Sequence, residues 1–107
     1  MTEEALSIRV HVENEKVIVI APVGEIDAFN AFRMREVVAE LLSYEPPAVT
    51  IDLALASFVD AAGLRVLIDA GGQLYVHGGR LTIRGTSQSQ RLALHLLEGD
   101  KVARVVP

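Results

Sequence analysis

The sequence predicts an α/β fold in which a mixed, mostly parallel sheet of about four or five strands is flanked by about three or four helices. Short runs of aliphatic and β-branched residues, such as 49–53, are typical of buried strands. They alternate with stretches such as 64–75, whose apolar residues recur every three or four positions, as in a helix. The resulting order is ββαβαβαβ, and the 107 residues have the length of one domain, expected over 1–107.

The first two strands are expected to form an antiparallel hairpin. From Leu6 to Val12, apolar and polar residues alternate, which is the period of a strand with one solvated face. The polar run 13–16 supplies the turn, and 17–23 is a more continuously apolar strand. Pro22 lacks a backbone donor, which indicates an edge or a bulge near the end of the second strand.

The run Gly24-Glu25-Ile26-Asp27 ends the second strand and opens a helix, with Asp27 as the predicted N-cap. Phe29 and Phe32 fit the apolar stripe of this helix poorly, so they either form an exposed partner contact or seal the rim of the core. The run 43–47 ends the helix because its two prolines cannot continue the hydrogen-bond ladder. The stripe itself consists of Ala31, Met34, Val38, Leu41 and Leu42.

The stretch 57–65 is the turn at which the buried strand 49–53 leads into the next helix. Asp60 is the predicted N-cap, whose carboxylate accepts hydrogen bonds from the first free backbone N–H groups. Ala61 and Ala62 occupy the first turn, where unpaired amides and the positive end of the helix dipole face outward. Ligands and partners bind at this end of the strands in α/β proteins, so this turn is the candidate functional site.

Glycines mark the middle and the end of this second helix. Gly71-Gly72 weakens it, which indicates either close packing against the sheet or a tolerated defect. Gly78-Gly79 is a strong C-terminal stop, and His77 before it is placed to interact with the negative end of the helix. Arg65 and Asp69, four positions apart, are expected to face solvent.

The last third of the chain completes the alternation of strands and helices. Residues 81–84 form a strand, and Ser87-Gln88-Ser89-Gln90 has the form of a capping box that opens a short helix through Leu97. Leu94 and Leu97 are its predicted buried residues, and 102–106 is a final extended segment.

Composition excludes several classes of function. The chain has no cysteine, which excludes disulfides, thiolate metal sites and cysteine nucleophiles. The net charge is −4 and the basic residues are scattered, which argues against nucleic acid as a partner. No apolar run approaches the ~20 residues of a membrane span, and the acidic start of the chain is unlike a signal peptide. We therefore expect a cytoplasmic protein.

The titratable residues do not form a pattern typical of catalysis. His11, His77 and His95 have no common spacing, so no metal site is expected. Asp27 and Asp60 stand where helix caps belong, and Asp52 is expected to bond a neighbouring loop. No glycine-rich phosphate or dinucleotide motif is present. We therefore predict a protein that is not an enzyme and needs no cofactor.

Three segments in register resemble the STAS domain family, the fold of bacterial anti-sigma-factor antagonists and of the cytoplasmic tails of sulfate transporters. The segment 24–27 is similar to the family's G-E-[LI]-D motif before the first helix. The segments 51–53 and 57–64 are similar to its D-L and F-x-D-[ST]-[ST]-G-L motifs. Gly78-Gly79 and the polar start of the third helix complete the order over nearly the whole chain.

The resemblance implies regulation by protein docking. An antagonist of this family binds a serine/threonine-kinase-type anti-sigma factor and frees the sigma factor. The kinase inactivates the antagonist by phosphorylating the Ser or Thr directly after the aspartate, which adds about two negative charges to the docking surface. The expected partner-binding residues here are Asp27, Phe29, Asp60, Ala61, Ala62, Gly63, Leu64 and Arg65. A weak homodimer through the phenylalanines stays open.

This sequence departs from the family pattern at the phosphoacceptor position. Ala61 stands there and Ala62 follows, and neither has a hydroxyl group. The resemblance therefore implies either a constitutive antagonist or a scaffold, such as a STAS subunit of an ABC-type transport system or of a multi-STAS signalling assembly. Other hydroxyl groups are expected to have structural roles. They belong to Ser57, Thr86, Ser87 and Ser89.

Overall fold

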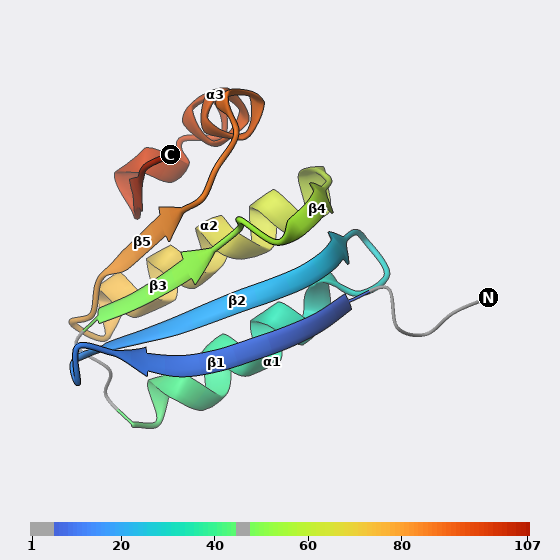
Figure 1. Cartoon of the computed structure of the whole chain (residues 1–107). Helices are drawn as coiled ribbons and strands as arrows, with labels where there is room; N and C mark the ends of the chain where they lie inside the picture. The colour runs from blue at the N-terminus through green and yellow to red at the C-terminus, as the bar shows by residue number, and fades with distance from the viewer. Residues whose placement is uncertain (1–5, 45–47) are drawn as a thin grey trace.

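The computed structural model describes residues 6–44 and 48–107 as a mixed sheet with helices (Figure 1). The strand order is β1-β2-β3-β5-β6, with β4 paired to β2 beyond the end of β3. The elements are β1 (Leu6–Glu13), β2 (Val17–Ile26), α1 (Ala31–Leu42), β3 (Ala48–Asp52), β4 (Ala56–Val59), α2 (Ala61–Val76), β5 (Leu81–Arg84), α3 (Gln88–Leu96), the 3-10 helix η1 (Gly99–Lys101) and β6 (Arg104–Val105).

The predicted α/β class is confirmed, and the structure has one strand more than the sequence indicated. β1 pairs with β2 antiparallel, as the hairpin prediction requires, and the other pairings are parallel. The unforeseen strand is β4, which belongs to the stretch interpreted as a turn. It has four residues and pairs with the last part of β2 across a register shift at Gly24/Glu25. Such a short strand carries no periodic signal of its own.

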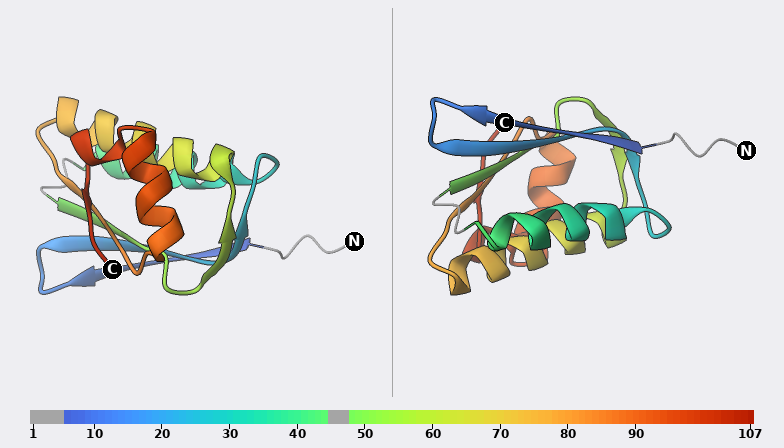
Figure 2. Two further views of the ribbon diagram at one scale, coloured as in Figure 1. Left: turned by 90° about the horizontal axis from the view of Figure 1, so that it is seen from above. Right: turned by 90° about the horizontal axis from the view of Figure 1, so that it is seen from below.

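The core lies between the sheet and the helices α1 and α2, which pack together on one face of it (Figure 2). α1 contributes the predicted stripe, of which Ala31, Met34 and Val38 are buried. α1 ends at Leu42, as expected, although residues 45–47 of the predicted stop lie outside the described residues. The central strands contribute Ile20, Ile51 and Ile83, all fully buried.

The burial expected for the apolar side of β1 is wrong at the hairpin end of that strand. Val10 is 49% and Val12 62% exposed, although both lie on the apolar side of β1. Figure 2 shows the reason, since the hairpin end of β1 lies farther from α1 than its other end. Tyr75 is exposed too, in the final turn of α2.

The expected end of α2 is confirmed in detail. Gly78 has a positive φ of 83°, its N–H donates to the Tyr75 carbonyl, and the Gly79 N–H donates to the Leu74 carbonyl. These are the two bonds of a Schellman motif. Within the helix, Gly71 is packed closely, since a Cβ there would lie 2.7 Å from the Val102 carbonyl oxygen. Gly72 faces open space, so the two neighbouring glycines are not equivalent.

The start of α3 also follows the prediction. The Ser87 side chain accepts from the Gln90 N–H at 3.1 Å, and the Gln90 side chain accepts from the Ser87 N–H at 2.8 Å. This is the predicted capping box. Leu94 is fully buried and Leu97 is half-buried against the core, so α3 is anchored mainly by one side chain.

Candidate functional site

The turn before α1 and the turn before α2 lie side by side at the carboxyl end of the parallel strands. Ile26 of β2 pairs with Val59 of β4, and the Asp60 N–H donates to the Ile26 carbonyl at 3.1 Å. The two helix starts are therefore neighbours at the same end of the sheet. We call these two turns, residues 27–30 and 60–65, the paired helix starts.

The carboxylate of Asp60 links the two turns. Its Oδ1 accepts from the Gly63 N–H at 2.9 Å, which is the predicted N-cap of α2. Its Oδ2 accepts from the Ala28 N–H of the other turn at 3.2 Å. The two oxygens of one side chain thus accept from backbone donors of both turns, one of which lies 32 residues before Asp60 in the chain. This second bond holds the turn before α1 against α2.

The predicted N-cap role of Asp27 is wrong. α1 begins at Ala31, and its N-cap is Asn30, which makes no side-chain cap hydrogen bond. Asp27 closes the turn before the helix: its Oδ1 accepts from the Phe29 N–H at 2.9 Å and the Asn30 N–H at 3.1 Å. In the reciprocal bond, Asn30 Oδ1 accepts from the Asp27 N–H at 2.8 Å. An aspartate readily closes such a turn, so a carboxylate before a helix does not fix where the helix begins.

Asn30 is a structural residue of the site that the sequence reasoning missed. Its Nδ2 also donates to the Glu25 carbonyl at 2.9 Å, so its side chain ties the turn back to the end of β2. The spacing Asp-x-x-Asn was a usable signal, because both residue types bond local backbone groups in turns.

Apolar side chains are exposed at the paired helix starts. Phe29 is 90% exposed, which excludes the interpretation that it seals the core rim. Phe32 is about half exposed. Ala61 and Arg65 are exposed and Ala62 is half-buried. Exposed apolar side chains gathered at one place favour contact with another protein.

Two of the predicted contact residues lie beneath this surface. Leu64 is only 5% exposed and packs in the core, and Gly63 is buried. A Cβ at Gly63 would lie 2.8 Å from side-chain atoms of both Ile26 and Val59. Their expected apolar surface is therefore absent, because the first turn of α2 presses this side against the strand ends. Gly63 and Leu64 support the site from below.

β4 adds an exposed aromatic residue that the sequence reasoning left unassigned. Phe58 pairs in register with Glu25, and its side chain is about half exposed. The alternation with the partly buried Val59 was the available signal, but the segment is too short for it to be distinctive.

The remaining predicted polar contacts are structural. Asp52 bonds a neighbouring loop as expected: its Oδ1 accepts from the Ala54 N–H at 2.9 Å. Its Oδ2 accepts from Arg84 Nε at 3.0 Å. Nδ1 of His77 lies 2.8 Å from the Gln73 carbonyl in the last turns of α2. Over residues 6–44 and 48–107, no three His, Asp or Glu side chains gather in a way that could hold a metal ion.

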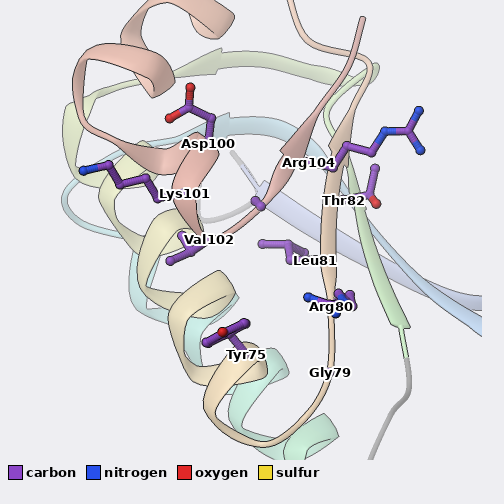
Figure 3. Close-up of a pocket in the computed structure, with 10 residues that line it drawn as sticks. Tyr75, Gly79, Arg80, Leu81, Thr82, Asp100, Lys101, Val102 and Arg104 are labelled. Atoms are coloured by element: carbon purple, nitrogen blue, oxygen red, sulfur yellow. The ribbon is translucent and has the colours of Figure 1, made fainter.

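A cavity of about 390 Å³ lies at the opposite end of α2 from Asp60 (Figure 3). Its lining comes from the end of α2, the start of β5 and the segment from η1 to β6. The charged ends of Asp100, Lys101 and Arg104 point away from one another and from the space between α2 and β5. They do not converge on a ligand position, so the paired helix starts are the better candidate. In the described part of the chain, no helix has the length and apolar character needed to cross a membrane.

Comparisons with known proteins bear on this fold. The family model described as "STAS domain" matches residues 9–106. The chain is 29% identical over 93 residues to "Anti-sigma-F factor antagonist RsfB" of Mycobacterium tuberculosis, which covers 87% of this chain and 75% of that protein.

Solved structures agree with that match. The crystal structure of an anti-sigma factor antagonist from Mycobacterium paratuberculosis superposes with a TM-score of 0.83 at 24% identity, covering 99% of this chain and 89% of that one. The phosphorylated form of the Bacillus cell fate determinant SpoIIAA gives 0.74 at 15% identity, with 94% and 92% covered. At these identities the likeness shows the fold.

Proposed function

Because the chain belongs to the STAS domain family, we propose that it antagonises an anti-sigma factor of the serine/threonine-kinase type, and that the paired helix starts are its docking surface. The similarity to anti-sigma factor antagonists supports the class of partner. In this proposal residues 1–107 act as one STAS domain in the cytoplasm, where a sigma factor works.

The observation that carries the proposal is the bridge from Asp60 to both turns. It fixes Phe29, with its exposed ring, beside the first turn of α2 without using any outward-facing apolar atom. A partner that covers this surface removes the Phe29 ring and the Ala61 methyl group from water, which is favourable at about 25 cal/mol per Å² of apolar area. Arg65, one turn further along α2, adds a positive charge at the edge of the same surface.

The residue at the phosphoacceptor-equivalent position determines whether phosphorylation there can regulate docking. Ala61 has no hydroxyl group, so a kinase partner has nothing to phosphorylate there. The docking surface consequently keeps its charge whatever the state of the kinase. We propose a constitutive antagonist whose effect is set by its amount.

The test is binding to a purified kinase-type anti-sigma factor from the same organism, followed by calorimetry. Ala61→Asp places a charge on the surface and should weaken binding by about tenfold or more, the effect of a residue worth at least 1.4 kcal/mol. Ala39→Asp, at an exposed position of α1 away from the turns, is the matched control and should bind normally. Equal binding by Ala61→Asp and the unchanged chain would reject this surface as the interface.

A second variant tests the missing switch. Ala61→Ser should be labelled by the kinase in the presence of ATP, whereas the unchanged chain should show no label. Labelling of the unchanged chain would contradict constitutive action and point to another acceptor, such as the exposed Ser57.

The absence of a hydroxyl group at both Ala61 and Ala62 also favours a second candidate, a STAS subunit or scaffold of an ABC-type transport or multi-STAS assembly. A scaffold needs the same docking surface but no off-signal. Stable co-purification with an ATPase, and no binding to any kinase-type anti-sigma factor, would select this candidate.

A further inference from the structure

We propose that a second copy of this chain adds to the outer edge of β1 as an antiparallel strand, about a two-fold axis at His11. Addition of a strand to an open sheet edge is a common mode of recognition, because the exposed backbone N–H and C=O groups of the edge supply ready hydrogen-bond partners. This surface is separate from the paired helix starts and does not depend on the proposed function.

The outer edge of β1 is open over the half next to the hairpin turn. In the described part of the chain β1 pairs only with β2 and is the first strand in the sheet order. The Glu13 carbonyl accepts from the Lys16 N–H at 3.2 Å across the turn, so the backbone of Glu13 faces β2. In an antiparallel ladder alternate residues face opposite edges, which turns the backbone groups of Ile8, Val10 and Val12 outward.

The other half of this edge is already protected. By the same alternation the Leu6 carbonyl faces outward, and it accepts from Arg33 Nη1 at 2.6 Å. Arg33 belongs to α1, so the helix side of the molecule closes the first part of the edge. A second strand is thereby directed to the segment from Ile8 to Glu13.

Apolar side chains gather at the open half. Val10 is 49% and Val12 62% exposed on the side of the sheet that elsewhere packs against helices. Figure 2 shows that the hairpin end of β1 lies away from α1, so a strand added here does not meet that helix. The valines of an added strand would lie beside these two and remove part of their apolar surface from water.

One register satisfies both faces of the strand. With the axis at His11, Val10 lies opposite Val12 of the second copy, and Arg9 lies opposite its Glu13. The outward-facing backbones of Val10 and Val12 then meet as hydrogen-bonded pairs, while the two His11 residues form the non-hydrogen-bonded pair on the axis. Apolar residues face apolar residues on one side, and opposite charges face each other on the other side.

The charges favour this register over axes at Arg9 and at Val10. An axis at Arg9 would set two arginines directly opposite each other, and an axis at Val10 would set Arg9 opposite His11, which gains no ion pair. Glu13 already accepts from Arg84 Nη1 and Nη2 at 3.0 Å each, and Arg84 also donates to Asp52. This cluster of one cation and two anions carries a net negative charge, which Arg9 of the second copy would neutralise.

The experiment is a charge swap measured by sedimentation equilibrium of the whole chain. Arg9→Glu alone sets like charges opposite each other twice in the dimer, and Glu13→Lys alone does the same. Each variant alone should therefore dimerise about tenfold more weakly than the unchanged chain, the effect of two attractive pairs made repulsive. An equimolar mixture restores opposite charges in both pairs, so the mixed dimer should form as the unchanged one does.

Controls keep the result specific to this edge. Arg35→Glu, at an exposed position of α1, should leave dimerisation unchanged. Circular dichroism checks that each variant is folded, which matters for Glu13→Lys because it removes the bond to Arg84. A chain that stays monomeric at millimolar concentration overturns the proposal, as does a mixture no more dimeric than its components. Loss of the dimer in Phe29→Ala would instead place the contact at the paired helix starts.

Discussion

The two ends of the sheet are stabilised in different ways. At the carboxyl end, the paired helix starts are fixed by the hydrogen bonds that the Asp60 carboxylate accepts from both turns and by close packing around Gly63. At the hairpin end, an ion pair between Glu13 and Arg84, 71 residues apart in the chain, joins β1 to β5, a strand with which it does not pair. Both side chains of that pair keep about a third of their surface exposed.

The difference indicates which end tolerates change. Close packing such as that around Gly63 does not depend on salt or pH, whereas exposed ion pairs are screened by salt and are lost when the carboxylate is protonated. We therefore expect the geometry of the carboxyl end to stay the same when salt or pH changes, and the contact at the hairpin end to weaken. Three substitutions test this contrast.

The largest effect is expected at the carboxyl end from Gly63→Ala. The added Cβ would lie 2.8 Å from side-chain atoms of Ile26 and Val59, so the free energy of unfolding should fall by about 1–3 kcal/mol, the usual cost of overpacking a core. Gly72→Ala is the matched control in the same helix, because its Cβ would meet nothing within 4 Å. It should raise stability by up to about 1 kcal/mol. Urea unfolding measures both, and equal effects would show that the strand ends yield to the new methyl group.

A smaller loss of stability is expected from Asp60→Ala. The substitution removes the N-cap of α2 and leaves the Ala28 N–H without its acceptor, at a cost of about 1–2 kcal/mol. Ser87→Ala removes a cap that serves α3 alone, so it should cost less than Asp60→Ala. Amide hydrogen exchange should also speed up at Ala28 only in the Asp60 variant. Unchanged exchange at Ala28 would mean that the bridge between the turns does not persist in solution.

The smallest effect on stability is expected at the hairpin end from Glu13→Gln, and this effect depends on pH. The hydrogen bonds from Arg84 lower the pKa of Glu13 in the folded chain. A lowered folded pKa means that the stabilisation is present above the unfolded value of 4.5 and is lost as the pH falls through the folded pKa. Glu13→Gln should therefore reduce Tm at neutral pH and approach the unchanged chain in acid.

The neighbouring Glu15→Gln is the control for this pH effect, since Glu15 lies exposed on the same turn. High salt should shrink the difference between Glu13→Gln and the unchanged chain. A difference that persists in acid would show that Glu13 acts through packing of its side chain and not through its charge.

The sequence predicted well the features whose signals are local. The cap at Asp60, the capping box at Ser87 and the stop at Gly78 each depend on a few adjacent residues whose side chains or backbone freedom decide the conformation. The order of strands and helices followed from hydrophobic periodicity, which can be recognised in one sequence without an alignment.

The errors concern features that depend on distant parts of the chain. β4 forms because the end of β2 has free backbone groups with which it can pair. The four residues of β4 alone do not predict this pairing. Val10 is exposed because the hairpin end of β1 lies away from α1, and Leu64 is buried because α2 presses on the strand ends. The N-cap prediction for Asp27 is wrong because a turn and a cap use the same carboxylate chemistry.

The bond from Ala28 to Asp60 has a consequence for the speed and strength of recognition. Two loops from separate parts of the chain are ordered together when the protein folds, so a molecule that touches both meets a prearranged shape. The conformational entropy of those loops is then lost before the encounter and does not oppose association. Complexes with such surfaces form with little backbone rearrangement, and their lifetimes are decided by the contacts themselves.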